Sequence, residues 1–157
     1  MVLIVSRQNL EKIRQESEKT QTQICARVLA TVLRYDAYDG LLTVIGSDDL
    51  ASRDESRAIK VDIGNLMLTL EVKPELLEYG STVNVDIAVS GCAWPVYGIG
   101  LRPLADPGVM ANPAAMDVLR AVANLESLPN VYKEVGYDTM DFVHCGGTDG
   151  EVSGDGE

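Results

Sequence analysis

The stretch Arg27–Gly46, RVLATVLRYDAYDGLLTVIG, decides the fold of this 157-residue chain. On both sides of its central turn, Tyr35–Gly40, apolar residues recur at about every second position, which is the period of a β-strand. The pair Asp39-Gly40 suits a hairpin, because glycine tolerates the positive φ angles of tight turns. The stretch therefore predicts two antiparallel strands joined by a turn, with Leu41–Ile45 as the returning strand.

The first of these strands starts near Ile24 and carries apolar residues on both faces. One face holds Ile24, Ala26, Val28, Ala30 and Val32. Leu29 and Leu33 lie on the opposite face. A strand of about twelve residues is long, and two apolar faces imply that each half buries a different side. We therefore expect the strand to bend and to serve two parts of a curved sheet.

Three later segments repeat the alternation: 58–63 (AIKVDI), 82–89 (TVNVDIAV) and 96–104 (VYGIGLRPL). Gly98 and Gly100 mark a bend or a close approach of backbones in the last segment. Between the first two, the segment 74–77 (PELL) is typical of a helical turn with proline at its first position. The polar segment 46–57 (GSDDLASRDESR) predicts a flexible, exposed loop.

Two helices flank the predicted strands. Ser6 can cap a weakly amphipathic helix that runs to about Thr22, which is more typical of a solvated helix than of a partner-binding one. Asn112 and Pro113 form the cap and first turn of a second helix that runs to about Ser127. One face of this second helix carries Ala115, Val118, Leu119, Val122 and Leu125.

These elements divide the chain into four parts. Residues 1–23 form an N-terminal helical extension, and residues 24–128 form one domain that includes the second helix. Residues 129–145 keep enough apolar side chains for a short packed extension. Residues 146–157 are rich in glycine and acid and predict a disordered acidic tail.

The order of the elements predicts the fold class, which is all-β with added helices. A long bent strand, a hairpin, a third strand, a helical connection and two more strands follow the order of the OB fold, a five-stranded Greek-key barrel. An N-terminal helix and a C-terminal amphipathic helix complete this prediction. An SH3-like barrel or a sandwich is the alternative, but neither explains the helical break between the third and fourth strands.

Four stretches carry a resemblance to a known family: RVLATVLRYDAYDGLLTV, AIKVDIGNL, EYGSTVNVDIAVSG and MDVLRAVANL. Over about residues 24–128 the chain resembles the small OB-fold subunit of the CST telomere-capping complex and its relative, the small subunit of replication protein A. The acidic tail, the N-terminal helix and the long 46–57 loop leave the choice between the two open. We favour the CST subunit, because its relatives vary most in such features.

The resemblance implies a non-catalytic subunit of a heteromeric complex that binds single-stranded DNA in the nucleus, at the telomeres of chromosomes. Its partner is a larger OB-fold subunit, which the C-terminal helix contacts through Ala115, Val118, Leu119, Val122 and Leu125. The same apolar stripe can instead cover the chain's own barrel, and one helix can do both. Trp94, in the segment GCAWP, either plugs the barrel end or anchors a partner.

Charge also favours a protein partner over bare DNA. The formal net charge is -11, so the chain as a whole repels polyanions and acidic membranes. The apolar start MVLIV is too short for a membrane span. A direct nucleic-acid role would instead use stacking aromatics beside cations on the face of the second and third strands, as Arg34, Tyr35, Tyr38, Arg57 and Lys60 can supply. A stand-alone oligonucleotide-binding protein would need a basic groove.

Little in the sequence indicates an enzyme or a cofactor. The single histidine, His144, allows no convincing catalytic triad or metalloprotease motif. A zinc site from Cys92, His144 and Cys145 would lack a fourth ligand. Aspartates in the turn and the 46–57 loop are explained by capping rather than by metal binding. We therefore expect no catalysis, no metal and no cofactor.

Overall fold

The computed structural model describes residues 1–69 and 72–127. The strands are β1 (Val2–Ile4), β2 (Gln23–Asp36), β3 (Leu41–Gly46), β4 (Ile59–Asp62), β5 (Thr82–Ser90) and β6 (Val96–Pro103). The α-helices are α1 (Arg7–Thr20), α2 (Gly64–Leu68) and α3 (Pro113–Glu126), and four short 3-10 helices are η1 (Leu50–Ser52), η2 (Glu55–Arg57), η3 (Pro74–Leu77) and η4 (Pro107–Ala111). The predictions for 129–145 and 146–157 lie outside the described residues.

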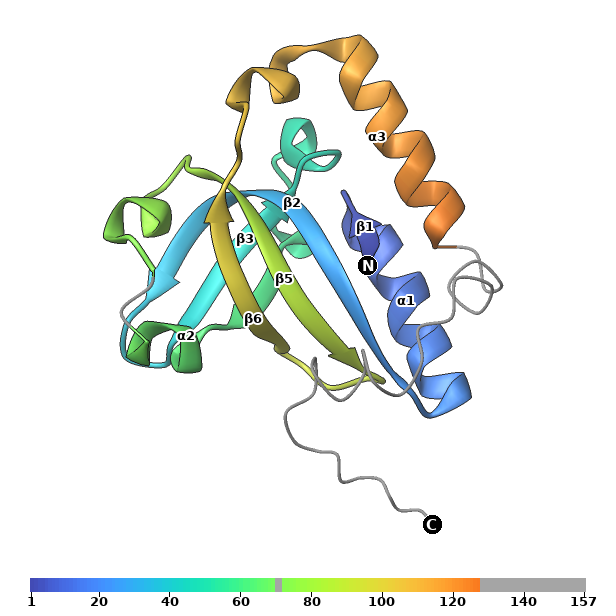
Figure 1. Ribbon diagram of the computed structural model, residues 1–157, viewed down its shortest axis with the longest axis horizontal. Helices are drawn as coiled ribbons and strands as arrows, with labels where there is room; N and C mark the ends of the chain where they lie inside the picture. The colour runs from blue at the N-terminus through green and yellow to red at the C-terminus, as the bar shows by residue number, and fades with distance from the viewer. Residues whose placement is uncertain (70–71, 128–157) are drawn as a thin grey trace.

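Five of the strands close into a barrel (Figure 1). Going round the ring, the order is β2, β3, β4, β6 and β5, and β5 pairs again with β2. All of these pairings are antiparallel except that of β4 with β6, which joins Val61 to Val96 and Asp62 to Tyr97. This order, with α2 and η3 between β4 and β5, is the Greek-key barrel of the OB fold. The predicted fold class is confirmed.

The length of β2 lets it serve both sides of the barrel. It pairs with β5 over residues 23–31 and with β3 over residues 30–36, and the register shifts between Val32 and Arg34. The expected bend therefore occurs at Leu33. The face of β2 that points away from the barrel interior is also apolar, because Leu29 on this face packs with Val5 and Ala123 in a second cluster outside the barrel.

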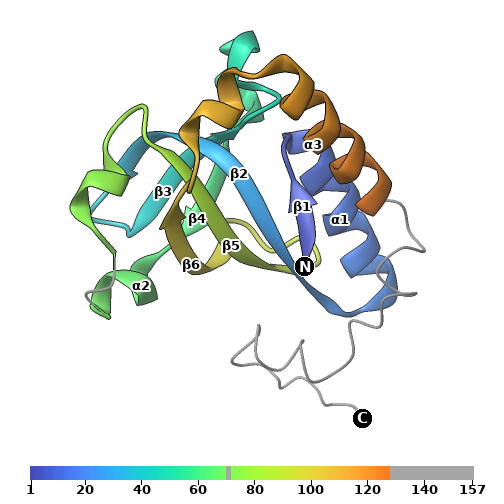
Figure 2. The same ribbon diagram turned by 45° about the horizontal axis from the view of Figure 1, so that its top comes forward.

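The N-terminal extension contains a strand that the helical prediction for 1–23 missed. β1 pairs in parallel with residues 26–28 of β2, and the side chains of Val2 and Ile4 are buried. Three residues are too few for periodicity to reveal a strand. Figure 2 shows β1, α1 and α3 together on one side of the barrel.

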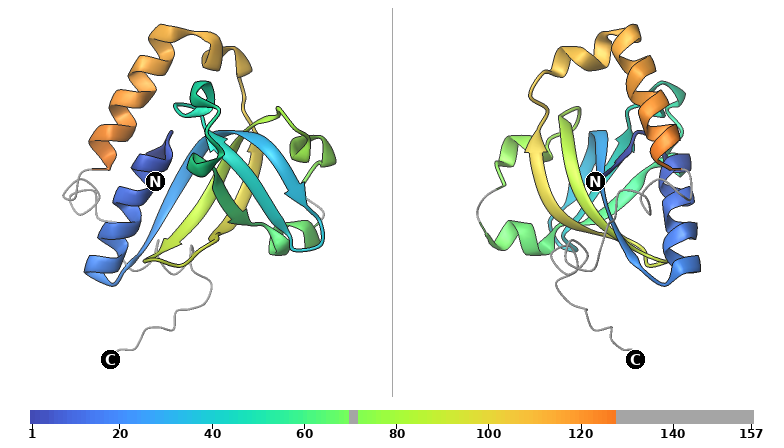
Figure 3. Two further views of the ribbon diagram at one scale, coloured as in Figure 1. Left: turned by 180° about the vertical axis from the view of Figure 1, so that it is seen from behind. Right: turned by 45° about the vertical axis from the view of Figure 1, so that its right-hand side comes forward.

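Helix α1 begins where the sequence predicts. The Ser6 hydroxyl caps it by accepting a hydrogen bond from the backbone N–H of Asn9. Leu10 and Ile13 are fully buried, so the helix packs more firmly than its weak amphipathicity suggested. Two views from other directions show α1 lying beside the first part of β2, with α3 above it (Figure 3).

The glycine in the middle of β6 marks a close approach of backbones, as predicted. A Cβ atom on Gly98 would lie 2.9 Å from a methyl of Val61 and 3.0 Å from the carbonyl oxygen of Asp62. The register between β5 and β6 shifts at the same place. The small residue thus permits β6 to reach β4 and close the barrel.

Candidate functional site

Helix α3 turns part of its apolar surface toward its own molecule. The side chains of Met116 and Ala123 are buried, and Leu119 packs against the cluster of Val5 and Leu29. These three positions follow the three- and four-residue spacing of one helix face. Of the stripe predicted to face either a partner or the chain's own barrel, only Leu119 belongs to this inner face.

The outer face of α3 is also apolar, and no residue in 1–69 or 72–127 covers it. Val118 is 62% exposed, Val122 is 39% exposed and Leu125 is 59% exposed. Ala114 and Ala121 are exposed on the same side. We call these five residues the outer stripe of α3. A partner helix could lie close along it, because the two alanines leave little side-chain bulk in the way.

Polar contacts fix α3 in place without using the outer stripe. Arg120 Nε lies 2.6 Å from Asp48 Oδ1, and Asn9 Nδ2 donates to Asn124 Oδ1 at 3.1 Å. The backbone N–H of Leu3 donates to Glu126 Oε1 at 2.7 Å. The helix is thus held from its middle to its end by the 46–57 loop, α1 and β1.

The predicted partner-binding residues divide between the two faces. Val118, Val122 and Leu125 belong to the outer stripe, whereas Leu119 faces inward and Ala115 is half-buried. Trp94 lies elsewhere, between β5 and β6. The exposed apolar face of α3 is therefore rotated relative to the predicted one, with Ala114 and Ala121 in place of Ala115 and Leu119.

The second candidate surface is the outer face of the barrel at β3 and β4. Arg34 of β2 stands opposite Thr43 of β3, and Thr43 stands opposite Lys60 of β4, so one row across the sheet carries two exposed cations. Directly opposed residues share a face. Tyr35 belongs to the neighbouring, inward row and packs partly against the core.

The other predicted nucleic-acid-binding residues are less favourably placed. Tyr38 is 96% exposed at the tip of the hairpin turn. Arg57 forms ion pairs with Asp49 and Asp54, and Arg34 forms one with Glu55 at 3.1 Å. Of the predicted cations, only Lys60 forms no ion pair with any residue in 1–69 or 72–127.

Trp94 lies against two arginines of α1, which the sequence did not predict. The guanidinium carbon of Arg7 is 4.3 Å from the centre of the indole ring, and that of Arg14 is 4.9 Å from it. Arg7 also donates to the carbonyl oxygen of Ala58, just before β4. Arg14 donates to the carbonyl oxygen of Cys92. These contacts bring α1, the β5–β6 turn and the start of β4 together around one aromatic ring.

Glu11 holds the two arginines in place. Its carboxylate lies 2.6 Å from Arg7 Nε and 2.8 Å from Arg14 Nη1. Burial alone would raise the pKa of Glu11, but the hydrogen bonds and charges of the two arginines outweigh it and lower that pKa below its ordinary value. The carboxylate thus stays ionised and partly neutralises the cations beside Trp94.

Tyr97 is a further exposed aromatic that the sequence analysis did not select. It stands opposite Asp62 on the outer side of the barrel and its hydroxyl meets the amide nitrogen of Asn65. The alternation of VYGIG could have revealed it, since Val96 points inward and Tyr97 must then point outward. Trp94, Lys60 and Tyr97 are carried on the β4 and β6 side of the barrel.

The described residues contain no group of three or more His, Cys, Asp or Glu side chains arranged to hold a metal ion. Cys92 is exposed with a free thiol. His144 and Cys145, the other members of the hypothetical zinc site, lie outside the described residues. Within 1–69 and 72–127, no helix is both long and apolar enough to cross a membrane.

Comparison with solved structures adds a similarity in fold. No family description matches the chain, and no curated protein matches its sequence. Among solved structures, the chain is similar to one from the Stn1–Ten1 complex of S. pombe. The two share 14% sequence identity with a TM-score of 0.43, over 69% of this chain and 85% of the other. The fold assignment stands on the strand pairing described above.

Proposed function

We propose that this chain is a non-catalytic OB-fold subunit that joins a larger OB-fold partner through α3 and so stabilises a complex that binds single-stranded DNA. The observation that carries the proposal is the exposure of Val118, Val122 and Leu125 on a helix whose opposite face is already packed. Apolar surface left open in a contiguous stripe marks a protein-binding site more often than a solvated one.

A CST-type complex at telomeres is the form of this proposal that we favour. It rests on the resemblance of four stretches of the sequence, and it implies a nuclear, telomeric location. The small subunit of a replication protein A complex is the alternative with the same architecture. Recovery of the chain with a larger OB-fold protein but without telomere or polymerase factors would favour that alternative.

Co-purification from the native cell tests the role of α3. We expect the double variant Val118→Glu with Leu125→Glu to lose the larger partner, because both charges would be buried unpaired in the contact. Both side chains are exposed in the single chain, so the β-type circular dichroism should not change. Leu119→Glu is less suitable, since Leu119 packs against its own molecule.

The matched control adds the same charge at the same spacing on another helix. Gln8→Glu with Gln15→Glu places two carboxylates seven residues apart on the exposed side of α1. This variant should retain the partner. Retention of the partner by the α3 variant would refute the proposal, and loss from both variants would show a general effect of charge.

A second candidate function is direct contact with single-stranded DNA on the β4 and β6 side of the barrel. The observation that favours it is the group of Trp94, Arg7 and Arg14, with Lys60 and Tyr97 on the same side. Bases stack on aromatic rings beside cations in such surfaces. Because Trp94 is the only tryptophan, its fluorescence should be quenched by oligothymidylate if this contact forms.

A further inference from the structure

A cavity of about 620 Å³ lies on the barrel surface, away from the outer stripe of α3 and from Trp94. It is lined by Leu33, Ile45, Leu50, Ala51, Arg53, Glu55 and Tyr79. The first four of these are apolar and come from β2, β3 and η1. The last three are polar or amphipathic. Aliphatic side chains thus form one part of the cavity lining, and polar or charged side chains form the rest.

Two large side chains at this cavity are exposed to solvent. Leu50 is 40% exposed and Tyr79 is 81% exposed. They come from segments far apart in the sequence, the 46–57 loop and the residues after η3. Exposed apolar groups that meet around a hollow are a feature of binding surfaces.

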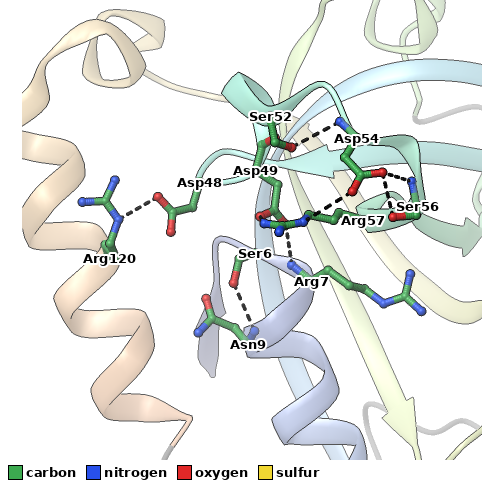
Figure 4. A network of polar contacts seen from close by, with 10 residues as sticks. All are labelled: Ser6, Arg7, Asn9, Asp48, Asp49, Ser52, Asp54, Ser56, Arg57 and Arg120. Atoms are coloured by element: carbon green, nitrogen blue, oxygen red, sulfur yellow. Dashed lines mark hydrogen bonds and ion pairs between the residues drawn. The ribbon is translucent and has the colours of Figure 1, made fainter.

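The loop that carries Leu50 is exposed, as the sequence predicted, and side-chain hydrogen bonds hold its base (Figure 4). The Asp49 carboxylate is almost fully buried and accepts hydrogen bonds from the backbone N–H of Arg7 at 2.8 Å and from Arg57 Nη1 at 3.3 Å. Ser52 Oγ donates to the carbonyl oxygen of Asp49 at 2.7 Å. The turn of η1 is therefore fixed at its base.

A second aspartate orders the other half of the loop. Asp54 Oδ1 accepts from the backbone N–H of Ser56 at 3.0 Å and from Ser56 Oγ at 2.7 Å. These two hydrogen bonds, with the charge of Arg57, lower the pKa of Asp54. Arg120 of α3 reaches Asp48 at 2.6 Å from the opposite side. The wall of the cavity is thus preformed, which reduces the entropy cost of binding a ligand.

The charge at the margin favours an acidic ligand. Arg34 and Glu55 neutralise each other at 3.1 Å. Arg53 is exposed, and its side chain forms no ion pair with any residue in 1–69 or 72–127. Among the described residues, one cation without an ion-pair partner therefore stands beside the aliphatic part of the hollow.

We propose that this cavity binds an extended peptide segment of a protein partner, which inserts one large apolar side chain and places a neighbouring carboxylate against Arg53. A nucleic acid is the weaker fit, because the lining offers one cation, Arg53, whereas a nucleic-acid strand carries a phosphate at every nucleotide. This site shares no residue with the outer stripe of α3. The inference therefore goes beyond the proposed function and can fail or succeed without it.

Nuclear magnetic resonance of the full chain tests the inference with three probes. The probes are the acetylated, amidated tripeptides Asp-Phe-Asp and Lys-Phe-Lys, and a short oligothymidylate. We expect Asp-Phe-Asp to shift the amide signals of Leu50, Ala51 and Tyr79 in a saturable way, with an affinity about five-fold higher than that of Lys-Phe-Lys.

Two variants test whether the shifts come from the cavity. Ala51→Trp fills the hollow from an exposed position and should abolish them. Arg53→Glu should weaken Asp-Phe-Asp binding by about five-fold and remove its advantage over Lys-Phe-Lys. Lys12→Glu, the same charge reversal at an exposed position of α1, should change neither.

Three outcomes would overturn the inference. The first is a lack of saturable shifts with either peptide. The second is tighter binding of the oligothymidylate at the same signals, which would make the cavity a nucleic-acid site. The third is a shift of the same signals with protein concentration alone, which would show that a second copy of the chain occupies it.

Discussion

At Gly46 the end of β3 passes directly under the N-terminal segment. A Cβ atom there would lie 2.4 Å from the carbonyl oxygen of Val5, which accepts a hydrogen bond from the backbone N–H of Asp48 at 2.8 Å. We expect Gly46→Ala to lower the free energy of unfolding by about 1–3 kcal/mol, because backbone must move to admit the methyl group. Chemical denaturation measures this.

The neighbouring residue supplies the control for Gly46. Ser47 Oγ is buried and has no hydrogen-bond partner within residues 1–69 and 72–127. Ser47→Ala should therefore be neutral or slightly stabilising. An unchanged denaturation midpoint for Gly46→Ala would show that the N-terminal segment is not packed on β3 as described.

Glu11 makes a pH-dependent contribution to stability. Its pKa is lowered in the folded chain, while an unfolded glutamate titrates near about 4.3. The group therefore stabilises the fold above that pH, and the stabilisation is lost as the pH falls through the folded pKa. Glu11→Gln should lower the free energy of unfolding at neutral pH by a small amount, because the carboxylate is partly exposed.

The difference between Glu11→Gln and the native chain should shrink below about pH 4. Denaturation at neutral pH and in mild acid measures it. Gln15→Ala, on the exposed side of the same helix, replaces no ionisable group and should show no such change with pH. A difference for Glu11→Gln that stayed constant with pH would mean that Arg7 and Arg14 do not lower its pKa.

Individual side chains were predicted less well than their strands. The period-two pattern put Lys60 on the outside of the barrel, and the structure places it there, whereas the same pattern continued from Val32 would have put the exposed Arg34 on the inner face. It could not show that the register shift beside Leu33 turns Tyr35 inward. Nor could it show that Arg7 and Arg14 meet Trp94, since those contacts join segments about eighty residues apart in the chain.

At the scale of elements, the cap of α3 determines how its outer stripe is presented. Asn112 Oδ1 accepts hydrogen bonds from the backbone N–H groups of Ala114 at 3.0 Å and Ala115 at 3.3 Å. Asn112→Ala should cost about 1 kcal/mol of stability, because these donors lose their partner. Thermal denaturation measures the loss, and Asn112→Asp should retain most of the native stability. Equal losses for both would show that the cap does not stabilise α3.

Elements with a strong local signal were predicted from the sequence, and those made by distant contacts were not. The hairpin, β5, and α3 with its Asn112 cap all lie where pattern and capping place them. β1, by contrast, depends on the pairing of Val2 and Ile4 with β2, and helix α1 separates these two strands in the sequence. The 46–57 loop is ordered by Asp49, whose partners Arg7 and Arg57 come from two different elements.

At the scale of the whole molecule, charge limits what the isolated chain can bind. Arginines on every side are held in ion pairs: Arg7, Arg14, Arg27, Arg34, Arg57, Arg102 and Arg120. The carboxylate in each pair partly neutralises the charge of its arginine, which weakens the attraction of that arginine for a phosphate. The net charge of -11 adds a long-range repulsion. A partner that covers acidic surface would therefore strengthen any contact with DNA.

This balance predicts the salt dependence of DNA binding. With about two phosphates neutralised near Lys60 and Trp94, the affinity of the isolated chain for oligothymidylate should fall with a log–log slope of only about -1.5. Trp94 fluorescence at several salt concentrations measures the slope. Lys60→Glu should make the slope shallower, whereas Lys19→Glu, at the far end of α1, should leave it unchanged.

A slope steeper than about -4 would require many free phosphate contacts and would favour a stand-alone oligonucleotide-binding protein. The chain would then need no partner to hold DNA, and the exposed stripe of α3 would need another explanation.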